Sequence, residues 1–172
     1  MLTWFFNRSP TEPKAAELYG AVVALARRPK LYEVFGVADT PEGRYEALVL
    51  HLFLAAERLM AEGEQGSKHA QALIEAFVTD MDDNMREMGV GDLSVPKKVK
   101  KAAAAFYDRA DVYRSALAAE GSEELAGALV RLVPAADDRA FDAGAFAADV
   151  REQAARLAAI PLGGLISGNL AS

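Results

Sequence analysis

The sequence predicts an all-α fold, a single-domain antiparallel bundle of about six helices. Apolar residues make up 52% of the 172 residues, and the chain is rich in alanine, which favours helix. Apolar positions recur at steps of three and four in several long stretches, as they do on one face of an α-helix. No stretch shows the alternation of apolar and polar residues that is typical of a half-buried strand. We expect three parts: an aromatic arm over residues 1–13, a helical domain over 14–160, and a flexible apolar tail over 161–172.

The composition excludes several classes of protein. The sequence has no cysteine, which rules out disulfides, thiol catalysis and thiolate metal sites, and fits a reducing compartment. The formal net charge is −6, which argues against DNA binding through a general positive field. No run of 18 apolar residues is present, so no membrane span is predicted. The first six residues lack the basic start of a signal peptide.

The arm carries three successive aromatic residues, Trp4, Phe5 and Phe6. Two interpretations stay open. The arm folds back onto the body, as isolated aromatic termini usually do, or it enters a membrane interface, where tryptophan is favoured.

The first helix is expected after Thr11, with Pro13 in its first turn, and Pro29 ends it. A short helical piece follows over 30–35 and ends at Gly36. The buried stripe of the first helix is predicted to hold Leu18, Tyr19, Val22, Leu25 and Ala26.

The next helix has a strong start signal. Thr40 is expected to cap its N-terminus, and Pro41 suits the first helical position, where its missing N–H costs nothing. This helix is predicted to end near Glu62. Its core stripe is Tyr45, Leu48, Val49, Leu52, Ala56 and Leu59. A second, polar stripe of Arg44, His51 and Arg58 repeats every seven residues. It is either a structural flank, in which His51 makes a buried hydrogen bond, or a recognition face.

We expect residues 63–66 to form a loop between two glycines and Ser67 to cap the next helix, which ends before Gly89. The predicted apolar face of this helix is Leu73, Ile74, Phe77, Val78, Met81, Met85 and Met88. The other side is acidic, and Asp82 and Arg86 are spaced to pair.

The acidic run fits none of three candidate sites well, and a solvated acidic face is the favoured interpretation. A calcium-binding EF-hand loop would need a glycine and a glutamate where Met85 and Gly91 stand. A magnesium–diphosphate helix would need an aspartate at Arg86, and a two-carboxylate acid/base site has no partner nucleophile. His51 and His69 lack ligand partners at helical spacing, so no metal site, no catalytic residue and no cofactor is predicted.

After Gly91, Ser94 is expected to cap the longest helix, over about 95–119. Its seam is Val95, Val99, Ala102, Phe106, Ala110, Tyr113 and Leu117, the spacing of a helix packed against antiparallel neighbours. A basic patch in its first turns comprises Lys97, Lys98, Lys100 and Lys101. This patch is either an ordinary solvated face or a contact for anionic lipid or ribosomal RNA.

The last third of the chain predicts a helix over 123–133, stopped by Pro134, and a polar linker over 135–144. A final helix over 145–159 buries Phe146, Val150, Leu157 and Ile160. The apolar stretch after Pro161 holds three glycines in eight residues, so we expect no regular structure there.

Beyond these physical patterns, the chain resembles the ubiquinol–cytochrome c reductase chaperone family over about residues 15–120. The most specific part is the run Arg86-Glu-Met-Gly-Val-Gly-Asp92. The remaining matches are Leu18-Tyr19, Ala26-Arg27-Arg28-Pro29, Asp39-Thr40, Gly43-Arg44, His51, Arg58-Leu59, Asp80-Met81-Asp82 and Phe106-Tyr107.

The resemblance implies a non-enzymatic assembly chaperone for the cytochrome bc1 complex, acting at the cytoplasmic face of the inner membrane. Its client would be newly made cytochrome b, with a second small assembly factor and the ribosome exit region as further partners. The residues that match the family pattern and are the client-binding candidates are Arg44, His51, Arg58, Asp82 and Arg86.

Two other classes stay open. One is a peripheral membrane adaptor that uses the aromatic arm and the lysine patch. The other is a helical enzyme that depends on the carboxylates around Asp80, for which no further catalytic group is found.

Overall fold

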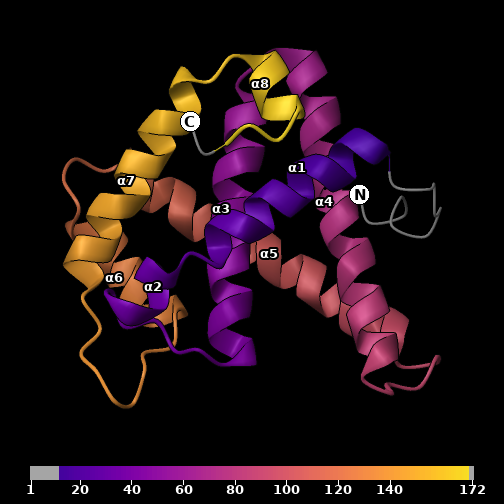
Figure 1. Cartoon of the computed structure of the whole chain (residues 1–172), viewed down its shortest axis with the longest axis horizontal. Coiled ribbons are helices and arrows are strands. Elements are labelled where there is room, and N and C mark those ends of the chain that lie inside the picture. Colours follow the sequence, from indigo (N-terminus) through magenta and orange to yellow (C-terminus); the bar gives the residue numbers. More distant parts are fainter. Residues whose placement is uncertain (1–11, 171–172) are drawn as a thin grey trace.

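The computed structural model describes residues 12–170, which form eight α-helices (Figure 1). The helices are α1 (Pro13–Ala26), α2 (Pro29–Glu33), α3 (Pro41–Met60), α4 (Gly63–Glu87), α5 (Val95–Ala118), α6 (Glu123–Leu132), α7 (Ala143–Ala159) and α8 (Leu162–Ile166). In this range the only β-type pairing is an isolated antiparallel bridge between Val37 and Ala135. The predicted all-α fold is therefore confirmed.

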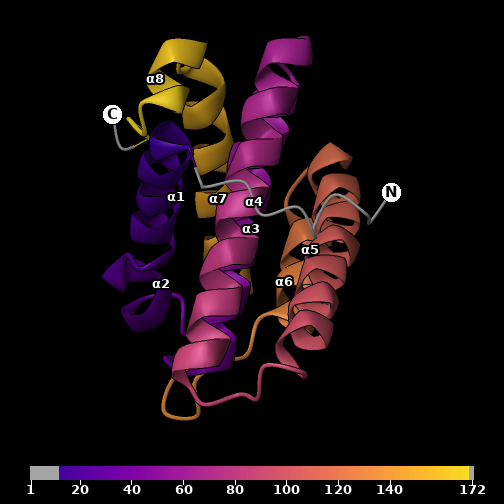
Figure 2. The same ribbon diagram turned by 90° about the vertical axis from the view of Figure 1, so that its right-hand side faces the viewer.

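Helix α3 is the centre of the bundle. It packs against α1, α4, α5 and α7, and every residue from 49 to 56 is buried. Figure 2 shows α1 on one side of α3 and α5 on the other. A helix segment that is apolar on all sides must be surrounded by other elements, and residues 47–56 of α3, which are apolar except for His51, fit this position.

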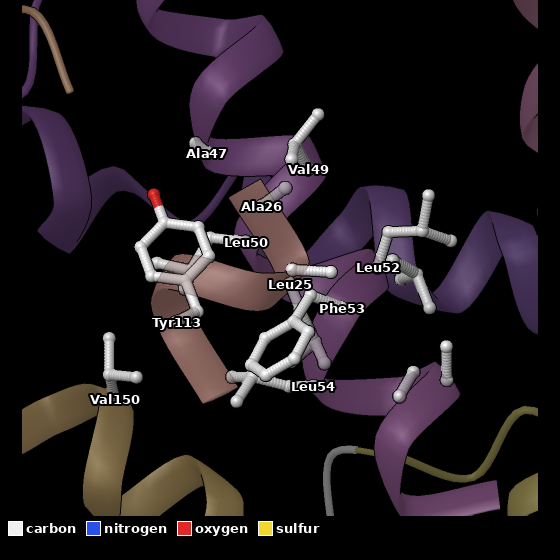
Figure 3. Packing of buried hydrophobic residues seen from close by; sticks show 14 of the residues in the cluster. Leu25, Ala26, Ala47, Val49, Leu50, Leu52, Phe53, Leu54, Tyr113 and Val150 are labelled. Atoms are coloured by element: carbon white, nitrogen blue, oxygen red, sulfur yellow. The ribbon is translucent and has the colours of Figure 1, made fainter. Parts of the chain in front are cut away.

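The core is formed by aromatic and aliphatic side chains that α3 shares with its neighbours. Figure 3 shows Phe53 and Tyr113 among Leu50 and Leu54, and their ring centroids are 5.8 Å apart. Phe77 continues the cluster into α4. Such pairs stabilise a core beyond the area that they bury.

The turn between α3 and α4 differs from the prediction. Residues 63–66 are not a loop, because α4 begins at Gly63 and Ser67 donates its hydroxyl to the carbonyl of Gly63 instead of capping. The two glycines have separate roles. Gly63 adopts a positive φ of 74°, and Gly66 lies so close to α3 that a Cβ would fall 1.8 Å from the carbonyl oxygen of Leu59. The glycine pair therefore makes a tight helix corner.

Helix caps were predicted with mixed success. Thr40 accepts a hydrogen bond from the backbone of Gly43 at 3.2 Å, as expected. Ser94 makes no side-chain capping bond, so that prediction is wrong. Instead, the backbone N–H of Ser94 and of Val95 both donate to the carbonyl of Gly91, so a backbone turn leads into α5.

The segment between α6 and α7 is tied to the loop before α3. Backbone bonds run from Ala38 to Pro134, from Ala136 to Gly36, and from Asp142 to Phe35, at 2.8 to 2.9 Å. Phe35 stacks on Phe146 of α7 with ring centroids 5.3 Å apart. The predicted polar linker is thus a well-bonded connection.

The C-terminal stretch is folded over residues 161–170, so the expectation of a tail without regular structure is wrong there. Leu162–Ile166 forms α8, which packs against α1. Leu165 and Leu170 are 1% and 2% exposed, because burying these apolar side chains outweighs the weak helix propensity of the glycines.

Candidate functional site

The three residues of the polar stripe on α3, Arg44, His51 and Arg58, lie in different environments. Arg44 is at the surface, where its side chain is 62% exposed and pairs with Asp39 at 2.6 Å. His51, one heptad later, is 2% exposed. Arg58 has a side chain that is 13% exposed. The structure therefore matches the structural-flank interpretation at His51, and the placement of this residue on an exposed recognition face is wrong.

His51 is satisfied by two partners. Its Nδ1 lies 2.7 Å from the carbonyl oxygen of Ala47, and its Nε2 lies 3.5 Å from Nη2 of Arg28. A carbonyl only accepts and a guanidinium only donates, so the neutral tautomer with hydrogen on Nδ1 suits both. Burial lowers the pKa of His51 to about 4, and the charge of Arg28 adds to this despite the opposing effects of Ala47 and Asp149.

Asp149 of α7 completes this buried network. It accepts hydrogen bonds from Arg28 at 2.8 Å and from Lys30 at 3.0 Å. Burial alone would raise its pKa, but the two cations outweigh burial and lower it. The network joins the α1–α2 corner to α3 and α7. One feature of the sequence indicates it: a carboxylate stands directly before Val150, on a helix face that is mainly apolar.

Arg58 joins α3 to the end of α7. Its guanidinium donates to the carbonyls of Leu157 at 2.9 Å and of Ile160 at 2.8 Å, and pairs with Glu62 at 2.6 Å. The last carbonyls of a helix have no intrahelical partner, so an arginine that reaches them caps the helix from outside. The geometry of Arg58 is that of a structural clamp.

Asp82 and Arg86 form the ion pair that their spacing predicted, at 2.7 Å. Arg86 also holds Asp92 at 2.6 Å, so the arginine ties the end of α4 to the following turn. Two residues before Asp82, Asp80 accepts a hydrogen bond from the Tyr19 hydroxyl at 2.7 Å, which links α1 to α4. Asp82 is largely buried, whereas Arg86 keeps a side chain that is 37% exposed.

The final turn of α4 extends beyond the packed body. Of the three methionines on the predicted apolar face, Met81 and Met85 are half-buried, whereas Met88 is 74% exposed. The lysine patch on α5 follows, and all four of its members are exposed. The aromatic arm, Trp4 to Phe6, and the predicted Thr11 cap lie outside the described residues.

The sequence did not predict an apolar groove of about 440 Å³ between α3, α4 and α5. Its floor includes Phe53, Ile74 and Phe106. Its mouth has Met60 and Tyr107, each 41% exposed. The groove depends on how three helices diverge, which periodicity alone does not give. In the sequence, Ile74 and Phe106 lie on predicted buried faces, and no local pattern marks Phe53, Met60 or Tyr107 as groove residues.

The rim of the groove is polar. Arg114 donates to both carboxylate oxygens of Glu57, at 2.6 and 3.0 Å, and Ser67 and Gln71 lie along the α4 side. An apolar floor with polar groups around it is typical of sites that bind apolar side chains. Within residues 12–170, no group of three or more acidic or histidine side chains is placed to hold a metal ion. No helix there has the length and apolarity needed to cross a bilayer.

The fold and this groove define a helical domain with an apolar groove at its surface. Comparison with protein families is specific: the model of the ubiquinol–cytochrome c chaperone family matches residues 33–171. Because this match covers most of the chain, the protein belongs to that family, whose members are assembly chaperones.

A solved structure agrees with the family match. The chain is similar to the crystal structure of the Cbp3 homolog from Brucella abortus, with 37% sequence identity and a TM-score of 0.78. The likeness covers 98% of this chain and 94% of that one. No curated protein matches the sequence. The similarity extends beyond residues 15–120, the range of the resemblance in the sequence, and includes α6, α7 and α8.

Proposed function

We propose that this protein is a non-enzymatic assembly chaperone that binds newly made cytochrome b at the cytoplasmic face of the inner membrane. Family membership supports the chaperone role. The apolar groove between α3, α4 and α5 is the observation that carries the proposed client contact. A second small assembly factor and the ribosome exit region are further proposed partners.

The groove suits an apolar membrane helix as its occupant. Such a helix offers rows of aliphatic and aromatic side chains, and one of these enters between Met60 and Tyr107. Burying one leucine-sized side chain yields about 1.5–3 kcal/mol. A single groove of this kind therefore holds a client reversibly, as a chaperone must, and methionine at the mouth adapts to different side chains.

The five residues that match the family pattern divide into two roles. Arg44 and Arg86 keep exposed guanidinium groups, and we propose that they contact polar parts of the client. Asp82 acts with Arg86 by holding it in place. His51 and Arg58 serve the client surface indirectly, because they fix α7 and the α1–α2 corner against α3.

The test is capture of cytochrome b by the tagged protein from its native membranes. We expect wild type to recover newly made cytochrome b and the double variant Met60→Ser/Tyr107→Ser to recover several-fold less. The matched control is Val34→Ser/Val130→Ser, since these residues are 61% and 62% exposed and lie away from the groove.

Equal recovery by the two double variants would refute the groove as the client site. Failure of wild type to recover cytochrome b, together with normal bc1 assembly in a deletion strain, would refute the proposed function itself. Thermal melts of each variant separate a loss of binding from a loss of folding.

A further inference from the structure

The turn between α4 and α5 presents two bare apolar side chains. Leu93 is 99% exposed and Met88 is 74% exposed. Other exposed large apolar residues, such as Val34 and Val130, are single and separated in sequence. Met88 and Leu93, in contrast, are the two ends of a single six-residue stretch that forms one tight turn.

This exposure is fixed by the backbone. Gly89 ends α4 with a positive φ of 78°, and the N–H of Val90 donates to the carbonyl of Met85 at 3.1 Å. The N–H of Ser94 donates to Gly91 at 2.8 Å, and Val95 is fully buried. With Val95 anchored in the core, the ordered turn holds Leu93 outward.

A run of basic residues follows the two apolar side chains in sequence. Lys97, Lys98, Lys100 and Lys101 are all exposed, and none has an ion-pair partner within the described part of the chain. The single acid between Met88 and Lys101 is Asp92, which Arg86 holds at 2.6 Å. Exposed Glu87 directly precedes Met88, but residues 86–101 hold five basic and two acidic side chains. This stretch therefore carries a net charge of +3, although the whole chain carries a net charge of −6.

The turn also lies at an extremity of the molecule. Figures 1 and 2 both show the α4–α5 connection at one end, beyond the body formed by α1, α3 and α7. A flat partner can therefore reach the connection from this end, where the loop between α6 and α7 also lies in Figure 2.

We propose that this surface, defined as Met88, Leu93 and the four lysines and called here the α4–α5 tip, docks the protein on an anionic lipid bilayer. Leu93 and Met88 enter the headgroup region, and the lysines bind lipid phosphates. The inference deepens the proposed function, on whose membrane location it rests, by naming the surface that makes the contact.

Lipid fits the tip better than RNA does. Lysines alone serve either polyanion, and both interactions weaken with salt. A nucleic-acid phosphate backbone offers nothing to a fully exposed leucine, whereas the acyl boundary of a bilayer buries it. The contribution of Leu93 and Met88 thus distinguishes the two partners.

The test is flotation of the full chain with vesicles of phosphatidylcholine alone or mixed with phosphatidylglycerol. Wild type should bind the anionic vesicles more tightly. Neutralising one lysine near a membrane weakens binding about fivefold, so replacing all four by glutamine should abolish flotation. Met88→Ser/Leu93→Ser should weaken binding at least tenfold, because both apolar contacts are lost. The control variants are Val34→Ser/Val130→Ser and Lys14→Gln/Lys68→Gln, which should bind like wild type.

A second measurement detects insertion directly. Trp4 is the only tryptophan, so Leu93→Trp in a Trp4→Phe background places one fluorophore at the tip. Its emission should shift to the blue when anionic vesicles are added. Unchanged emission, or equal flotation of Met88→Ser/Leu93→Ser and its control, would overturn the proposal and leave a purely electrostatic patch. No client is present in either assay, so failure here is separate from failure of cytochrome b capture.

Discussion

Replacing His51 with glutamine tests whether the buried network on α3 is structural. Glutamine stays neutral at all pH values and cannot reproduce both the bond to Ala47 and the contact with Arg28. Removing a buried hydrogen-bonding partner costs about 1–3 kcal/mol. We therefore expect the variant to be less stable than wild type by this amount at pH 7.

The pH dependence gives a sharper signature. The pKa of His51 is lowered from 6.5 to about 4 in the folded protein. Between these values the unfolded chain binds a proton that the folded chain does not, so the stability of wild type falls as the pH falls. Each pKa unit corresponds to about 1.4 kcal/mol, so the full loss is about 3 kcal/mol by pH 4. The His51→Gln variant has no titrating group at this position, so its free energy of unfolding does not fall for this reason.

The charged groups facing His51 are Arg28 and Asp149. Arg28 stays charged throughout. The folded pKa of Asp149 is lowered below 3.8, so its stabilising contribution is lost only as the pH falls below that value, outside the window. The difference between wild type and variant therefore isolates His51.

The assay is urea unfolding followed by circular dichroism at several pH values from 7 to 4. The advantage of wild type over His51→Gln should shrink with falling pH and vanish or reverse near pH 4. A difference that stays constant over this range would refute the argument, because it would mean that His51 titrates alike in both states.

Two further predictions concern stability, each measured by urea unfolding and thermal melts. Gly66→Ala should destabilise the protein by about 1–3 kcal/mol, because the new Cβ would overlap the Leu59 carbonyl. The matched control is Gly127→Ala, whose Cβ meets nothing within 4 Å and which should stabilise α6 by about 0.5–1 kcal/mol. Similar effects at the two glycines would contradict the close approach of α3 and α4. Tyr113→Phe should leave stability unchanged or raise it, because the buried hydroxyl has no hydrogen-bond partner among the described residues. A loss above about 1 kcal/mol would show that the hydroxyl is satisfied.

The fold was largely predictable because its signals are local. The Thr40–Pro41 start, the stop at Gly89 and the seam of α5 from Val95 to Tyr113 each depend on a few neighbouring residues. Errors arose where packing overrode propensity. The glycines at 63 and 66 made a helix corner instead of a loop, and Leu165 and Leu170 gave regular structure to a stretch that its glycines disfavour.

The candidate site was less predictable. The apolar groove needs residues from three helices, and Met60 and Tyr107 become its mouth only because α4 and α5 diverge there. Part of the α4–α5 tip could be predicted, because its four lysines form a clear cluster in the sequence. The exposure of Leu93 and Met88 could not be predicted from the sequence, because it depends on where the body of the bundle ends.

The sequence by itself determined the all-α class, the order of the long helices, most of their buried faces and the family resemblance. Periodicity, proline and glycine act within a few residues, so these features need no tertiary information. Only the tertiary structure decided that Arg44 is exposed while His51, seven residues later on the same helix, is enclosed by Arg28 and Asp149 from distant segments. Burial is set by which elements cover a face, and that depends on contacts between residues up to 121 positions apart.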